Sequence, residues 1–219
     1  MLQTLLPSLA LADGDSSVVV TGGTHNPMAP CFEYLRDVFG VLAETAGVQA
    51  YFEMKRAGFY PAGGGEVLMQ VRGLASPDAL APIRLTSRGE LKYVEGVSAA
   101  SASLPEHIVE RQSRQALGRL ASAKCRASLE QARWETRSPG TVVFLRAVFS
   151  RCVGGFFALG KRGVPAEKVA DEAVEPMVEY LNAPCAVDAR AADQLLTLAA
   201  LCPDSSRFLA PVSYTHLTL

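Results

Sequence analysis

The sequence predicts an α/β (α+β) fold, because segments with the period of strands are interspersed with a segment that has the period of a helix. Apolar residues alternate with polar ones over 50–54 and again over 67–71, as in half-buried strands. From 32 to 46, apolar residues recur every three or four positions, which predicts an amphipathic helix. Glycine- and proline-rich stretches separate these segments, as is typical of turns.

The composition is that of a globular protein. The 219 residues are 49% hydrophobic and 20% charged, so the chain can bury a full core. A formal net charge of −1 argues against a basic nucleic-acid coat, and any RNA site would be a local patch. Basic residues outnumber acids over 84–137 and acids dominate 167–179, but such runs are usually solvated faces. Five scattered cysteines without a Cys-x-x-Cys pair favour buried thiols in a reducing compartment over disulfides or zinc.

The opening segment is interpreted as a helix. Residues 1–12 end in Ala-Leu-Ala, which resembles a signal-peptidase site, but no basic residue precedes their apolar core. No run in the chain reaches the ~18 apolar residues that a membrane span needs. We therefore expect an internal helix of a longer, cytoplasmic or nuclear protein that is neither secreted nor membrane-bound.

The first half predicts a strand, helix, strand, strand unit. The β-branched run Ser17–Thr21 ends at a glycine pair, which predicts a buried strand that enters a tight turn. Gly47 is well placed to end the helix over 32–46. The two alternating strands can cover the apolar stripe of that helix, at about 1.5–3 kcal/mol for each large side chain buried.

A second unit is predicted beyond a polar, proline-containing boundary at 76–88. It begins with a strand over 91–97. Ser103 and Glu106 then have the spacing of a capping box, which predicts that a helix opens there. The remaining predictions are strands over 128–135, 141–149 and 153–159, turns at 138–140 and 154–155, a helix from 165 to about 181 with a kink at Pro176, and a last helix from 188 to about 201.

Two glycine-bearing segments carry the functional signal. Residues 22–30 are Gly-Gly-Thr-His-Asn-Pro-Met-Ala-Pro, and residues 58–66 are Gly-Phe-Tyr-Pro-Ala-Gly-Gly-Gly-Glu. Glycine is needed where φ is positive, or where a bulky charged partner lies against bare peptide groups. We expect the two turns to lie together and to expose such groups. His25 could meet a ligand there, or it could be an exposed histidine satisfied by solvent.

Several other catalytic motifs are incomplete. Residues 155–161 have the spacing of a phosphate-binding P-loop up to the lysine, but Arg162 replaces the hydroxyl residue that coordinates magnesium. With only His25, His107 and His216 in the chain, no metal triad is predicted, and His107 is expected at the surface. No Gly-x-Ser-x-Gly elbow occurs. The chain itself therefore supplies no predicted catalytic residue and no metal ligand.

The two glycine segments resemble those of RNA 3'-terminal phosphate cyclases, and the resemblance runs from about Gln3 to about Pro203. It covers only the middle of a family member. The resemblance implies repeats of a βαβαββ-type unit, similar to the C-terminal domain of translation initiation factor three, with a smaller α/β domain inserted. By this comparison, residues 1–88 are most of the second repeat, 89–185 the insert, 186–210 the start of the third repeat, and 211–219 an artefactual tail.

The resemblance also implies a reaction. Family members use ATP and a divalent metal, Mg or Mn, to convert RNA 3'-phosphate ends to 2',3'-cyclic phosphates through a histidyl-AMP intermediate. The nucleophilic histidine would lie beyond the resemblance and a metal-associated glutamate before it, so this chain is expected to be inactive alone. The alternative is a non-catalytic relative that acts in ribosome assembly, but such relatives depart from the Phe-Tyr-Pro-Ala that precedes the glycines here.

The family's ATP contacts carry over residue by residue. Gln3 matches the glutamine of Leu-Gln-Thr, and Asp193 and Gln194 match the end of Tyr-Leu-x-Asp-Gln, although on the residues alone they would be a solvated helix face. Arg190 replaces the tyrosine and offers a guanidinium plane for stacking on adenine, with Pro30 on the opposite side of the base. The implied RNA or phosphate cleft would be lined by Gly22, Gly23, Thr24, His25, Tyr60, Gly63 and Gly64.

Overall fold

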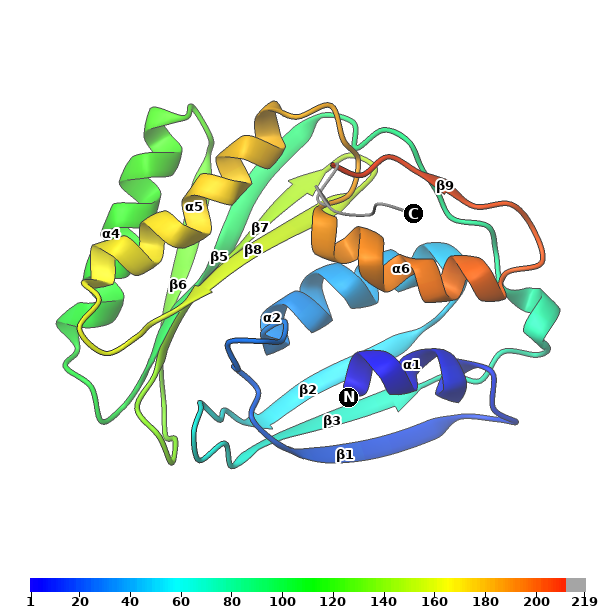
Figure 1. The fold of residues 1–219 in the computed structure, drawn as a ribbon, viewed down its shortest axis with the longest axis horizontal. Helices are drawn as coiled ribbons and strands as arrows, with labels where there is room; N and C mark the ends of the chain where they lie inside the picture. The colour runs from blue at the N-terminus through cyan, green and yellow to red at the C-terminus, as the bar shows by residue number, and fades with distance from the viewer. Residues whose placement is uncertain (212–219) are drawn as a thin grey trace, which may run out of the picture.

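Two sheets lie side by side in the computed structural model, each with helices on one face (Figure 1). The structure describes residues 1–211, so all of the predicted tail except Pro211 lies outside the described residues. The first sheet has the strand order β1-β3-β2 and the second the order β6-β5-β7-β8, while β4 and β9 form a short parallel pair. This mixture of helices and sheets confirms the predicted α+β class.

The first lobe is a three-stranded antiparallel sheet. Strand β3 (Gly65–Val71) lies between β1 (Ser16–Gly22) and β2 (Ala50–Arg56). The alternation in the sequence corresponds to the inner face of β2 and β3, which packs against the helices. Its buried side chains are Phe52, Val67, Met69 and Val71.

Strand β1 corrects an expectation. The β-branched run over 17–21 predicts a buried strand, yet no residue of β1 is buried and Val19 is 59% exposed. The physical reason is position, since β1 is at the edge of its sheet and helices cover one face alone. The β-branched residues of β1 therefore predict a strand but do not predict that its side chains are buried.

The helix predicted over 32–46 is present, but it is irregular. Its widened middle turn brings Gly40 so close to the sheet that a Cβ would lie 3.0 Å from the Phe52 ring. Gly47 ends the helix as predicted, with a φ of 84°. The segments are α2 (Phe32–Tyr34), a π-helical stretch (Leu35–Gly40), α3 (Val41–Ala43) and a 3₁₀ turn (Glu44–Ala46).

The second lobe is a four-stranded sheet with two helices on one face (Figure 1). Strand β5 pairs in parallel with β6, and α4 connects them, whereas β5 with β7 and β7 with β8 are antiparallel. The strands are β5 (Leu91–Ser101), β6 (Ala127–Trp134), β7 (Thr141–Phe149) and β8 (Val153–Leu159), and the helices are α4 (His107–Ser122) and α5 (Ala166–Asn182).

The predicted capping box is wrong. Helix α4 begins at His107, and neither Ser103 nor Glu106 caps it through a side chain. Instead, the Ser103 hydroxyl lies 2.8 Å from that of Ser101, at the end of a strand four residues longer than predicted. Strand β5 extends to Ser101, so Ser103 lies in the turn that follows it, and the helix begins only at His107. His107 is exposed, as expected.

Gly154 and Gly155 do not form a turn but lie inside β8. A Cβ on Gly154 would lie 2.8 Å from the Tyr180 ring, and a Cβ on Gly155 would lie 2.5 Å from Val38. These glycines are needed because other side chains pack closely against them. A glycine pair in a sequence does not show whether it serves such packing or a turn. The P-loop-like spacing that starts at Gly155 is likewise strand, as its apolar residues predicted.

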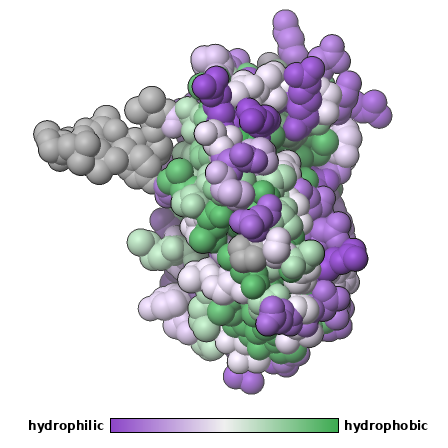
Figure 2. All heavy atoms as spheres, turned by 90° about the vertical axis from the view of Figure 1, so that its right-hand side faces the viewer, coloured by the Kyte–Doolittle hydropathy of each residue, from purple (hydrophilic) through white to green (hydrophobic). Residues whose placement is uncertain are grey.

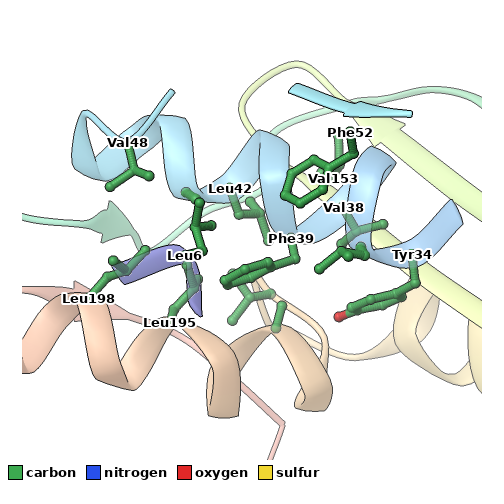
Figure 3. Close-up of a cluster of buried hydrophobic side chains, with 14 of the residues drawn as sticks. Leu6, Tyr34, Val38, Phe39, Leu42, Val48, Phe52, Val153, Leu195 and Leu198 are labelled. Carbon is green, nitrogen blue, oxygen red and sulfur yellow. The ribbon is translucent and has the colours of Figure 1, made fainter. Parts of the chain in front are cut away.

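One core cluster draws side chains from both lobes and from two further helices, α1 (Leu2–Ala10) and α6 (Ala189–Leu201). Figure 3 shows Phe39 and Val38 of the π-helical stretch between Leu195 of α6 and Val153 of β8. The opening segment is thus a helix with a buried face. The chain is further joined by the short strands β4 (Arg84–Leu85) and β9 (Arg207–Phe208), and a 3₁₀ turn covers Pro77–Ala79.

Figure 2 shows the side of the molecule where α6 ends. Hydrophobic surface runs down the middle of this face, and hydrophilic side chains gather above it and along its right-hand margin. Leu201 at the end of α6 is 44% exposed, and Leu209 after β9 is 47% exposed. Within the described residues, no helix has the length and apolar character required to cross a membrane.

Candidate functional site

The two glycine turns meet at one end of the first lobe. The backbone N–H groups of Thr24 and His25 both donate to the carbonyl of Gly58, at 2.9 and 3.1 Å. The Gly58 N–H in turn donates to Thr24 Oγ1 at 2.9 Å. Gly63 has a φ of +60°, and a Cβ there would lie 3.1 Å from the Gly23 nitrogen. The two turns therefore form one structural unit, as expected.

His25 is neither an exposed turn residue nor a residue that lines a cleft. Its relative exposure is 1%, and its ring lies between Phe59 and Trp134, with centroid distances of 5.0 and 5.1 Å. Nδ1 lies 2.7 Å from Thr24 Oγ1, and Nε2 lies 2.9 Å from a carboxylate oxygen of Glu33. Both sequence interpretations of His25 are thus wrong, because the residue supports the turns from inside the protein.

Glu33 is the buried partner that sequence reasoning missed. Burial alone would raise the pKa of its carboxyl group, but the charge and hydrogen bond of His25 outweigh burial and leave the pKa below its ordinary value. An acid in the first turn of a helix usually reads as a solvated residue near the helix dipole. Only the short distance between Glu33 and His25 in the folded structure shows that Glu33 is a buried partner and not a solvated acid.

The five ATP candidates line one cavity of about 380 Å³, which we call the α1–α6 pocket. They come from helix α1, the segment after β1, and helix α6. Gln194 Nε2 donates to Gln3 Oε1 at 2.8 Å, which ties α6 to α1 across 191 residues. The complete lining is Gln3, Pro27, Met28, Ala29, Pro30, Arg190, Asp193 and Gln194.

Gln194 presents an unsatisfied group in this pocket. The residue is 5% exposed, and its Oε1 has no hydrogen-bond partner among the described residues. A buried acceptor left unpaired costs about 1–3 kcal/mol. Arg190 also lines the pocket, and one face of its guanidinium is packed on Phe157, 4.5 Å from the ring centroid. Its plane is therefore held in place by the second lobe.

A second cavity of about 270 Å³ adjoins the first, because Gln3, Ala29 and Pro30 line both. We call it the β1-turn pocket. Three of the predicted cleft residues line it, namely Gly22, Gly23 and Thr24.

The other predicted cleft residues lie outside the lining of the β1-turn pocket. Gly63 supports Gly23 from behind, Gly64 lies beneath the Arg137 side chain, and Tyr60 is 68% exposed on the outer side of the turn. The first glycine segment therefore lines the cavity, and the second packs against the first and supports it.

Metal ligation finds no support in the part of the chain that the structure describes. Residues 1–211 contain no group of three or more His, Cys, Asp or Glu side chains that could hold a metal ion. All five cysteines are free thiols, and burial raises the pKa of Cys152 to about 11, which disfavours the thiolate that a metal requires.

The chain is similar to known proteins of one family. Residues 1–218 match a family model described as RNA 3'-terminal phosphate cyclase. The chain is 41% identical over 218 residues to an RNA 3'-terminal phosphate cyclase of Methylococcus capsulatus, a match that covers 100% of this chain and 60% of that protein. It is 38% identical to one of Trichormus variabilis, covering 62% of that protein. The chain therefore spans about 60% of the length of these curated relatives.

Proposed function

The chain belongs to the RNA 3'-terminal phosphate cyclase family, and we propose that it forms part of an enzyme that uses ATP to convert RNA 3'-phosphate ends to 2',3'-cyclic phosphates. In this proposal a histidine that is not among the site residues named above attacks the α-phosphate of ATP and releases pyrophosphate. It passes the AMP to the 3'-phosphate, and the 2'-hydroxyl then closes the ring and releases AMP. Covalent transfer divides one difficult displacement into two easier ones.

The observation that supports the proposal most strongly is the convergence of the five ATP candidates in the α1–α6 pocket. Its volume of about 380 Å³ falls in the usual range of small-ligand sites. The Gln194 amide suits an adenine edge, Asp193 suits the ribose hydroxyls, and the ring of Pro30 offers an apolar surface to one face of the base. Arg190 supplies a fixed planar cation at the same site.

The β1-turn pocket would receive the reacting phosphates. Its proximity to the α1–α6 pocket, through Gln3 and Pro30, supports this assignment. Gly22, Gly23 and Thr24 line it, and although the Thr24 N–H is taken by Gly58, glycine-containing turns are common anion-binding elements. Mg or Mn belongs to the proposed complete enzyme, but the residues described here do not form its site, and no step is assigned to it.

Two finer assignments accompany this proposal. Residues 1–88 and 186–210 would belong to repeats of the βαβαββ type, with 89–185 as the inserted domain. The catalytic function is favoured over the ribosome-assembly alternative because the chain keeps Phe-Tyr-Pro-Ala before its glycines. A protein extended to the full length of its relatives should form an acid-labile AMP adduct and a phosphatase-resistant RNA end, and the enzymatic proposal fails if neither is found.

ATP binding tests the pocket within this chain. Gln3→Ala and Asp193→Ala should each weaken ATP binding about tenfold, because each removes a hydrogen-bonding group worth about 1.5 kcal/mol at a charged or buried site. Isothermal titration calorimetry measures the effect, and Asp204→Ala, an exposed acid beyond α6, serves as the matched control. Absence of ATP binding by the unsubstituted chain, or equal binding by all three variants, would contradict the assignment.

A further inference from the structure

Gly64 lies between two arginines that come from different lobes. Arg56 of β2 donates from Nε to the Gly64 carbonyl at 2.5 Å. Arg137, in the turn between β6 and β7, approaches so closely that a Cβ on Gly64 would lie 2.5 Å from its Cδ. Gly64 also has a φ of +76°, which other residues adopt with difficulty. Both arginines are exposed, so the third glycine position of the turn lets two guanidinium groups gather at the surface.

The charge of this surface is not balanced. Arg56 has one acidic neighbour, Glu66, at 3.6 Å, which is too long for a hydrogen bond. Within residues 1–211, Arg137 makes no salt bridge. Two exposed cations, of which only Arg56 has an acidic neighbour, produce a local positive potential that would attract an anion.

Tyr60 presents an aromatic ring on the same turn as Gly64. It is 68% exposed, which is unusual for a large side chain on a turn that is otherwise tightly held. The Ala62 N–H donates to Ser138 Oγ at 3.0 Å, and the Gly63 N–H donates to the Phe59 carbonyl at 2.8 Å. The ring is thus displayed from a backbone fixed by both lobes.

The turn that carries this surface packs against the rim of the β1-turn pocket. Gly63 follows Tyr60 on the same turn and lies against Gly23, and Gly23 lines that pocket. Figure 1 shows the β2–β3 turn beside the β6–β7 turn at the same end of the molecule. A chain that lies on Tyr60 and Gly64 is therefore held by the turn that packs against Gly22 and Gly23 of the pocket.

On the basis of the proposed function, we infer that Tyr60, Arg56 and Arg137 form a docking surface for single-stranded RNA just upstream of its 3'-phosphate. A base stacks on Tyr60, and the phosphates that flank it contact the two arginines. Aromatic rings beside cations are how proteins hold single strands without reading sequence. A duplex does not fit this role, because its bases are already stacked on each other. Through Arg137, the second lobe contributes directly to RNA binding.

Fluorescence anisotropy with a short, labelled single-stranded RNA that carries a 3'-phosphate tests the inference on the chain of residues 1–219. Tyr60→Ala should weaken binding about tenfold and leave its salt dependence unchanged, because stacking releases no counterions. Arg137→Ala should instead lower the slope of log affinity against log salt concentration by about 0.7, the value for one phosphate contact on a single strand.

Matched controls are Tyr51→Ala, which removes a tyrosine that is 56% exposed on the outer face of the first sheet, and Arg114→Ala, which removes an exposed arginine of α4. Neither should change RNA binding. Equal losses for Tyr60 and Tyr51, an unchanged salt slope for Arg137→Ala, or no RNA binding by the unsubstituted chain would each overturn the inference. ATP binding measured on the same samples separates these outcomes, since failure of the proposed function would remove ATP binding as well.

Discussion

At the scale of single residues, the pair formed by His25 and Glu33 explains why the glycine turns hold their shape. The imidazole is buried between two aromatic rings and uses both of its nitrogens, one on Thr24 and one on Glu33. Thr24 in turn bonds the second turn at Gly58. The chain of contacts therefore runs from Glu33 of α2, through His25, to both glycine segments.

Glu33→Gln should lower the free energy of unfolding by about 3 kcal/mol, because it leaves the buried His25 without its charged partner. Urea denaturation measures the loss. Glu44→Gln, at an exposed site in the same helix, should cost little. An equal effect of the two substitutions would contradict the assigned role of the pair.

The stabilisation by Glu33 should depend on pH in a defined direction. Because the folded state holds the pKa of Glu33 below its ordinary value of 4.5, the contribution is complete above that value and is lost as pH falls through the lower, folded pKa. The difference in unfolding free energy between the unsubstituted chain and Glu33→Gln should therefore shrink below about pH 4.5. A difference that stays constant from neutral to acid pH would show that the carboxylate charge plays no part.

At the scale of elements, strand β8 and helix α6 are positioned by a few buried contacts that bring the lobes together. Asp188 caps α6 by accepting from the Ala191 N–H at 2.9 Å. The same carboxylate accepts from Tyr34 Oη at 2.7 Å and from the Gly155 N–H at 3.1 Å. One side chain thus orients the start of α6, which carries Arg190 and Asp193 to the α1–α6 pocket.

Glycine at 155 is part of this junction and gives a sharp test. Gly155→Ala should destabilise the protein by about 1–3 kcal/mol, because the added methyl group would lie 2.5 Å from Val38 and 3.0 Å from Tyr34. Gly118→Ala, in α4 where nothing lies within 4 Å of the added atom, should instead stabilise by about 0.5–1 kcal/mol. Thermal unfolding of both variants checks the prediction, which fails if the two shifts have the same sign.

The sequence predicts these elements well where one local cause dominates and poorly where packing decides. The alternation of apolar and polar residues correctly predicted the inner faces of β2 and β3, and Gly47 correctly predicted the end of a helix. Both signals are local, because they depend on neighbouring residues and on the backbone conformation of one glycine. The exposure of β1, the π-helical turn and the absence of a Ser103 cap depend on what packs against them. The same holds for Gly154 and Gly155, which resemble turn residues until the side chains that they face are known.

At the scale of the whole molecule, the site exists because distant segments converge. Helix α1, the segment after β1 and helix α6 lie far apart in the sequence, and all three line the α1–α6 pocket. The family resemblance identified those residues one by one, whereas their convergence, the support from Glu33 and Trp134, and the burial of His25 required the structure. No sequence period connects Gln3 with Gln194, although their side chains are hydrogen-bonded.

The most direct test of the proposed nucleotide site is the footprint of ATP, measured by hydrogen exchange with mass spectrometry on the chain of residues 1–219. ATP should slow amide exchange in peptides over 1–10, 22–31 and 189–194, the segments that line the α1–α6 and β1-turn pockets. Peptides of the outer strands of the second lobe should be unchanged. Protection confined to the second lobe, or no protection at saturating ATP, would contradict the account.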